Sequence, residues 1–232
     1  MAGALFTGCG GGGDTPAQTS GDIKIGMIKH LNVTETKIDE LVKAVEERAN
    51  IKLSTHTTTF YDSLPLLQMG IESGSVDEAS TYKCVADYLI ARNSKIEILN
   101  GHNAAHLSDN FAFAMRASDT ELKQQIDDAI SAMKSDGTLD SITKTYITDL
   151  KGAEDPPEVA IETYDDAQSL KIGVTGDLPP LDLVLANGEI AGFNTAMLSE
   201  LGKRLHRNIQ IVQIELSSPY FRDEIVHIGF KK

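Results

Sequence analysis

Short apolar segments alternate with amphipathic helical segments along the first hundred residues, and this alternation restricts the chain to few folds. The predicted strands cover residues 23–28, 51–58, 76–80 and 95–99. The predicted helices between them cover residues 34–49, a stretch that begins at Asp62 or Ser63 and ends at Gly70 or Gly74, and residues 83–92. Strands separated by helices run parallel in one sheet whose two faces the helices cover. This part of the chain therefore predicts an α/β domain over residues 22–100.

The second half repeats the α/β pattern after a helical stretch. The pattern predicts a strand at 111–116, helices at 120–133 and 139–150, a strand at 171–174, a helix at 195–205 and a strand at 209–214. Residues 151–158 contain Pro156-Pro157 and read as the clearest linker. We expect a second α/β domain over 101–232, divided into 101–150, a linker region at 151–170, and 171–232.

The acidic composition limits the class of partner. The formal net charge is −13, so the chain lacks the excess of Lys and Arg that would neutralise phosphates. We therefore expect no nucleic-acid partner. An acidic surface also keeps an exported protein soluble, although an ordinary solvated surface explains the same charge.

The N-terminal segment predicts a lipid anchor. The run LFTGC ends at Cys9 and resembles a bacterial lipobox, with the small residue Gly8 just before the cysteine. A glycine-rich, polar stretch follows, so residues 1–21 read as a signal remnant and flexible tether. We expect lipidation of Cys9; a disordered tail with a chance cysteine stays open as the alternative. No apolar run elsewhere is long enough to cross a bilayer.

The run IGVTGDLPPL at 172–181 and the run FAFAMR at 111–116 carry motifs that occur together in one protein family. They resemble the opening and the closing segment of the family-3 extracellular solute-binding proteins of ABC importers. The resemblance to the opening of that family rests on the run IGVTGDLPPL at 172–181, on Gly188 and on the triplet GFN at 192–194. The resemblance to its closing segment rests on FAFAMR at 111–116, DTEL at 119–122 and KSDGTL at 134–139. The closing segment comes first, which predicts a circular permutation or a fragment cut across a tandem repeat.

The resemblance implies a two-lobed, type-II periplasmic-binding-protein-like α/β fold in permuted order. Residues 22–100 resemble lobe 2, and lobe 1 is divided between 101–150 and 171–232. Relatives carry a helix, a strand and a loop, including an Arg that pairs with a substrate carboxylate, where this chain passes from Ile214 directly to Glu215. Lobe 1 is therefore expected to be incomplete, with an open sheet edge.

The implied function is capture of a small polar, amino-acid-like solute by closure of the two lobes for an ABC permease. The expected protein is extracytoplasmic, anchored to the membrane only through lipid, monomeric, free of cofactors and not an enzyme. Two alternatives stay open: a sensing module of a signalling receptor, and an enzyme built on the same fold. An enzyme needs a poised acid or base, and the sequence shows no clear pair and hence no catalytic residue.

The candidate ligand-binding residues come from both lobes. In lobe 1 the loop after the strand at 171–174 brings Thr175, Asp177 and Leu178 to the cleft, where strand ends bind ligands in α/β folds. Asp177 either pairs with a ligand ammonium or caps a turn. In lobe 2, Asn32 and Thr34 either bind the ligand at a helix start or cap that helix.

Two further observations concern the chemistry of the site. Tyr82 stands at a position where relatives often carry an Asp for the α-ammonium, which weakens the assignment of a standard amino acid. His56, His102 and His106 lack metal-ligand spacing with a Cys or an acidic residue, so no metal site is expected.

Overall fold

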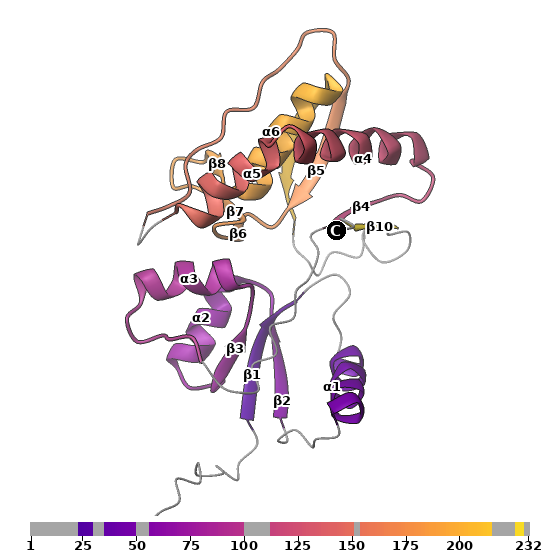
Figure 1. Cartoon of the computed structure of the whole chain (residues 1–232). Coiled ribbons are helices and arrows are strands. Elements are labelled where there is room, and N and C mark those ends of the chain that lie inside the picture. Colours follow the sequence, from indigo (N-terminus) through magenta and orange to yellow (C-terminus); the bar gives the residue numbers. More distant parts are fainter. Residues whose placement is uncertain are drawn as a thin grey trace, which may run out of the picture.

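The computed structural model describes residues 23–29, 35–49, 56–99, 112–150, 154–214 and 226–229. The described elements form two groups, one above the other in Figure 1. We call residues 23–99 the N-terminal lobe and residues 112–229 the C-terminal lobe. The predictions for Cys9, Asn32 and Thr34 lie outside the described residues.

The N-terminal lobe is built on a short parallel sheet. Strand β1 (Ile23–Ile28) lies in the centre, between β2 (His56–Tyr61) and β3 (Glu78–Ser80), and both neighbours run parallel to it. Helix α1 (Glu35–Ala49) lies on the opposite side of the strands from α2 (Leu64–Glu72) and α3 (Lys83–Arg92) (Figure 1). This is the covered parallel sheet that the strand–helix alternation predicts.

Helix α2 begins with a cap that the sequence specifies. Ser63 has an extended backbone, and its side chain accepts a hydrogen bond from the Leu66 N–H. Pro65 occupies the first turn, where its missing N–H costs nothing. The helix then buries Leu64 and Leu67. The N-terminus of α2 is thereby fixed at the end of the lobe that faces its neighbour.

The C-terminal lobe has a core made by two segments that are distant in sequence. Helices α4 (Thr120–Ser135) and α6 (Phe193–Leu205) pack together over the parallel pair β5 (Ser169–Val174) and β9 (Asn208–Gln213). The buried members of this core are Ile126, Ala129, Ile130, Met133, Met197, Leu198, Leu201 and Ile209. The α4 residues recur at helical spacing, which is the pattern that predicted the helix.

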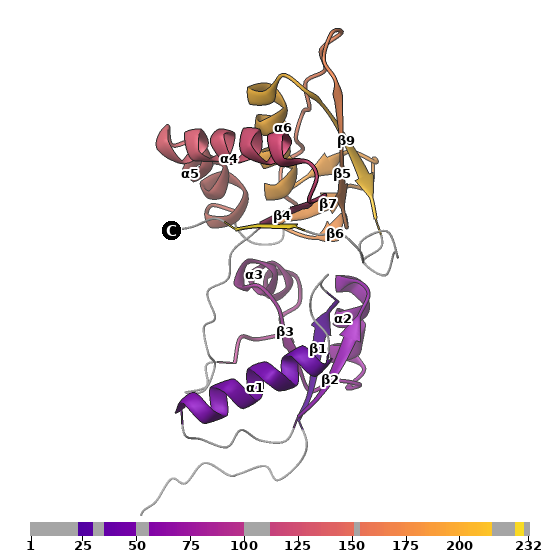
Figure 2. The same ribbon diagram turned by 90° about the vertical axis from the view of Figure 1, so that its right-hand side faces the viewer.

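Short elements complete the C-terminal lobe. Strand β4 (Ala112–Met115) pairs antiparallel with β10 (Val226–Gly229). Helix α5 (Thr138–Thr143) continues into a π-helical turn, η1 (Lys144–Thr148). Strands β6 (Asp177–Leu178), β7 (Asp182–Val184) and β8 (Ile190–Ala191) form a small antiparallel meander that faces the N-terminal lobe (Figure 2).

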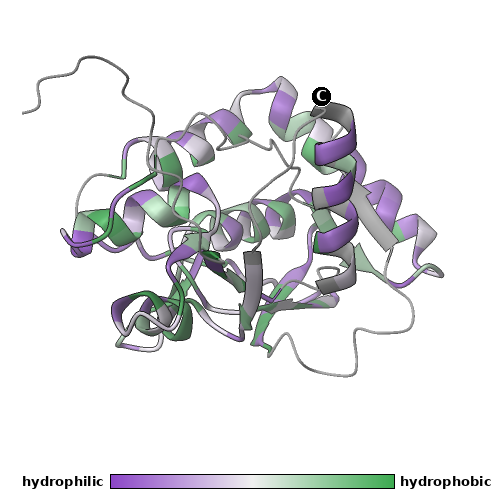
Figure 3. Cartoon of the chain, turned by 90° about the horizontal axis from the view of Figure 1, so that it is seen from below, coloured by the Kyte–Doolittle hydropathy of each residue, from purple (hydrophilic) through white to green (hydrophobic). Residues whose placement is uncertain are grey.

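Polar and apolar residues are segregated as in other globular proteins. Viewed from below, the outward turns of the helices are mostly hydrophilic, and apolar residues gather on the strands and the helix sides that face them (Figure 3). Among the described residues, no helix is long and apolar enough to cross a membrane.

Two sequence predictions need correction, and one feature was not predicted. Residues 95–99 form no strand, and Ile98 and Leu99 are exposed. The helix predicted at 139–150 begins at Thr138 and widens into the π-helical turn at Lys144. The meander of β6, β7 and β8 was not predicted, since strands of two or three residues are too short to show a period.

Candidate functional site

The loop after β5 is held in place by the start of α6. Phe193 N–H donates to the Pro180 carbonyl at 3.0 Å, and Asn194 N–H donates to the Leu181 carbonyl at 2.7 Å. Gly192 precedes the helix with φ of 105°. A Cβ at this position would lie 2.7 Å from the Leu181 carbonyl oxygen, so only glycine allows the approach. The helix start therefore fixes the position of residues 177–181.

A buried carboxylate organises the same loop from inside. Asp182 is 5% exposed. Its carboxylate accepts hydrogen bonds from Thr175 Oγ1 at 2.9 Å, from the Gly176 N–H at 2.6 Å and from Asn194 Nδ2 at 2.9 Å. These three donors satisfy a buried charge that would otherwise be costly. The Thr175 hydroxyl, predicted to face a ligand, is directed to Asp182 in this structure.

Asp177 lies where the two lobes meet. Burial raises the pKa of its carboxyl above the ordinary value, and the neighbouring charge of Asp182 adds to the increase. The Thr175 side chain and backbone N–H groups, including that of Leu64, lower the pKa and so act in the opposite direction. Leu64 is the first residue of α2. The carboxyl of Asp177 thus faces the N-terminus of a helix of the other lobe.

An apolar contact joins the lobes beside Asp177. Leu181 is 2% exposed and belongs to the core cluster of the N-terminal lobe, with Leu64, Leu67 and Leu89. Leu178 packs against the same cluster. We call this set of five leucines the apolar brace. The loop predicted to line a ligand cleft is therefore packed against the neighbouring lobe.

Tyr82 also reaches this cluster. It is the residue before α3, with φ of −65° and ψ of 143°, and its side chain makes no capping hydrogen bond. Its ring packs against the cluster together with Cys84, whose thiol pKa is raised by burial. The structure thus places Leu178, Asp177 and Tyr82 around one junction between the lobes, and Thr175 behind it.

A polar contact joins the lobes at a second point. Asp155 Oδ1 accepts hydrogen bonds from Arg92 Nη2 and from the Tyr88 hydroxyl, both at 2.7 Å. The Arg92 guanidinium also lies 3.4 Å from the centre of the Tyr88 ring. We call these three residues the polar brace. The sequence analysis missed it, because Asp155 stands in a linker and has no distinctive pattern.

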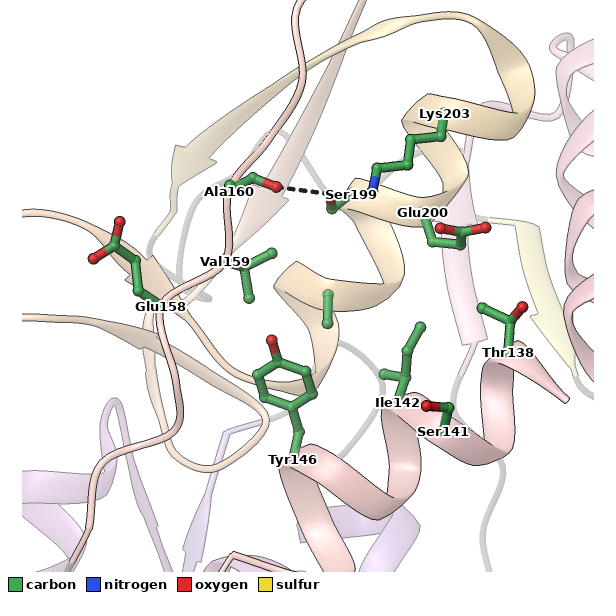
Figure 4. A pocket seen from close by; sticks show the side chains of 11 residues that line it. Thr138, Ser141, Ile142, Tyr146, Glu158, Val159, Ala160, Ser199, Glu200 and Lys203 are labelled. Carbon is green, nitrogen blue, oxygen red and sulfur yellow. Dashed lines mark hydrogen bonds between the residues drawn. The ribbon is translucent and has the colours of Figure 1, made fainter.

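An open pocket lies elsewhere in the C-terminal lobe. It measures about 260 Å³, between α5, η1, α6 and residues 158–160 (Figure 4). The Tyr146 ring rises from η1 toward Val159, and Ser199 Oγ donates to the Ala160 carbonyl at 2.9 Å. Lys203 pairs with Glu162, and Glu200 pairs with Arg204. These charges are already neutralised, and none of the predicted site residues lines the pocket.

The described residues contain no group of three or more His, Cys, Asp or Glu side chains that could hold a metal ion. Beside Asp177, the junction between the lobes offers one carboxyl group, backbone N–H groups, the Tyr82 side chain and apolar side chains. Such groups bind and orient a small molecule.

Comparison with known proteins gives one match. Residues 36–149 match the family of bacterial extracellular solute-binding proteins, family 3. The matched range includes α2, α3 and α4, and therefore elements of both lobes. No curated protein and no solved structure matches the chain. Over residues 36–149, the chain is similar to the bacterial extracellular solute-binding proteins of family 3.

Proposed function

We propose that the protein captures a small polar, amino-acid-like solute outside the cytoplasm and delivers it to an ABC permease. The observation that supports this is the family match over residues 36–149. In this proposal the ligand lies between the lobes and contacts Asp177 and Leu178 from one side and Tyr82, Asn32 and Thr34 from the other, with Thr175 close by. The protein acts by binding and cleft closure, without chemistry or a cofactor.

Asp177 is the ligand contact that the geometry supports best. Its carboxyl is half-buried at the junction, and a ligand ammonium there would favour its charged form. Charge-assisted hydrogen bonds contribute about 1.5–3 kcal/mol each. Loss of this contact should therefore weaken binding at least about tenfold.

Calorimetric titration with the twenty amino acids and related small polar solutes tests this proposal. We expect binding of at least one solute, and a dissociation constant at least about tenfold higher in Asp177→Asn. Asp165→Asn is the matched control, because Asp165 is exposed. Submicromolar binding that Asp177→Asn leaves unchanged would overturn the proposed site.

The lipid anchor is a separate part of the proposal. The protein is expected to carry a diacylglycerol on Cys9, to remain a monomer, and to reach the membrane only through that lipid. Radiolabelled fatty acid should be incorporated into the wild-type chain but not into Cys9→Ala. Equal labelling of both proteins would contradict the anchor and leave the solute-binding proposal untouched.

The permuted order of the lobes also stays a proposal. It is supported by the shared core of α4 and α6, which unites segments 112–150 and 154–214. The described pairing of β4 with β10, and not with β1, agrees with the same arrangement. Strand β5 has one partner, β9, among the described strands, which agrees with an incomplete lobe 1.

A further inference from the structure

We propose that the chain holds its own lobes closed in the absence of ligand, with the loop 177–181 seated against α2 and α3 where a ligand has to enter. The proposal concerns the regulation of the cleft and rests on the proposed solute-binding function. In this proposal the contacts of the two braces compete with the ligand for the space between the lobes.

The apolar brace is the main support for closure. Leu181 is 2% exposed and Leu64 is 3% exposed, although they belong to different lobes. Opening the lobes would return the Leu181 side chain to water and would uncover the part of the cluster that it contacts. Burial of such side chains is favourable, and its strength does not depend on a bound solute.

The loop 177–181 is held rigidly within the C-terminal lobe. Its two ends are fixed by Asp182, which is buried and receives three hydrogen bonds, and by the backbone bonds to Phe193 and Asn194. Residues 177–181 therefore move with the C-terminal lobe as one body. Separation of the lobes therefore requires the whole loop 177–181 to leave the surface of α2 and α3.

The polar brace adds directional contacts at a second point. Asp155 lies on the segment that follows α5 and η1, and it reaches Arg92 and Tyr88 at the end of α3. The Asp155 side chain is 56% exposed, so water screens this ion pair and its contribution is small. Two contacts at separate points restrict rotation of one lobe on the other more than either contact alone.

Closure without ligand has a measurable cost for binding. If the ligand enters only the open form, its apparent dissociation constant equals the intrinsic dissociation constant divided by the fraction of open molecules. Weakening the braces should therefore raise the open fraction. Replacing the buried Leu181 by alanine should increase the open-to-closed ratio at least about tenfold.

The test is a distance measurement without ligand. Spin labels are placed at Ser94→Cys in the N-terminal lobe and Ser131→Cys in the C-terminal lobe, two exposed positions, in a Cys9→Ser, Cys84→Ala background. The purified protein should give one narrow distribution of distances between the labels. Leu181→Ala should broaden it toward longer distances, Asp155→Ala should do so to a smaller extent, and Leu181→Met should resemble the wild type.

Each outcome decides the proposal. A broad or long distribution in the unliganded wild type overturns it, as does a narrow distribution in Leu181→Ala. Circular dichroism with a urea transition shows whether each variant is folded, and Asp155→Ala, altered at an exposed site, gives a reading even if Leu181→Ala fails to fold. If Leu181→Ala shifts the distance between the labels and no solute binds to the protein, closure by the braces is supported and the proposed solute-binding function is contradicted.

Discussion

Asp182 is the residue on which the geometry of the candidate site depends. It is buried, carries a formal charge, and receives hydrogen bonds from a side chain, a backbone N–H and the first turn of α6. Each of these donors would be left unpaired by a smaller apolar side chain. The residue acts on the loop 177–181 by positioning it and does not face the junction between the lobes.

Removing the Asp182 carboxylate should therefore destabilise the C-terminal lobe. A buried donor left without a partner costs about 1–3 kcal/mol. We expect Asp182→Ala to lower the free energy of unfolding by at least about 2 kcal/mol, measured by urea denaturation. Asp165→Ala, at an exposed position, should change it by less than about 0.5 kcal/mol. Similar values for the two variants would show that the buried network does not hold the loop.

Tyr88 reports on the polar brace through its titration. Burial, followed by the hydrogen bond to Asp155, raises the pKa of Tyr88 to about 12. Asp155→Ala removes an acceptor and a negative charge, so the phenol should ionise at lower pH in this variant. Ultraviolet absorbance titration of wild type and Asp155→Ala, with Tyr88→Phe to identify the signal, measures the difference. An unchanged Tyr88 pKa would mean that Asp155 does not reach the ring in solution.

Asp177 should give stability a dependence on pH. Burial raises its pKa in the folded protein above that of the unfolded chain, so the folded form binds the proton more tightly. Its contribution favours folding at low pH and is lost as pH rises through the raised pKa. Asp177→Asn should thus gain stability relative to wild type as pH increases across this window. Urea unfolding of both proteins at several pH values tests the sign; a constant difference would contradict it.

At the scale of helices and strands, hydrophobic periodicity predicted the elements that are long enough to show a repeating pattern. The amphipathic spacing of Ile126, Ile130 and Met133 predicted α4, and the Ser63–Pro65 cap lies where the sequence placed the start of α2. The strand expected at 95–99 was wrong, because local propensity does not show whether a pairing partner exists. Asp155 and Asp182 were missed for the same reason, since their partners come from distant parts of the chain.

The packing of α4 against α6 predicts that the two halves of the C-terminal lobe unfold together. Met133 is fully buried in their common core. Met133→Ala should lower the free energy of unfolding by about 2–5 kcal/mol, whereas Met133→Leu should cost less than about 1.5 kcal/mol. Hydrogen exchange should show lost protection in both α4 and α6 of the alanine variant. Loss confined to α4 would contradict a shared core and, with it, the support for the permuted order.

The closed arrangement of the whole molecule depends on whether the apolar or the polar brace contributes more free energy. The two contributions can be distinguished by their dependence on salt. A solvent-exposed ion pair such as Arg92–Asp155 contributes about 0–1 kcal/mol, whereas burial of one leucine contributes about 1.5–3 kcal/mol. At 0.1 M salt the screening length is about 10 Å, so added salt weakens the polar brace and leaves the apolar brace intact. The wild-type distance between labels at Ser94→Cys and Ser131→Cys should therefore stay constant as ionic strength rises. In Leu181→Ala the apolar brace is weakened, so closure depends more on Asp155 and should decrease with salt. A wild-type distribution that opens with salt would assign closure to the charges instead of the leucines.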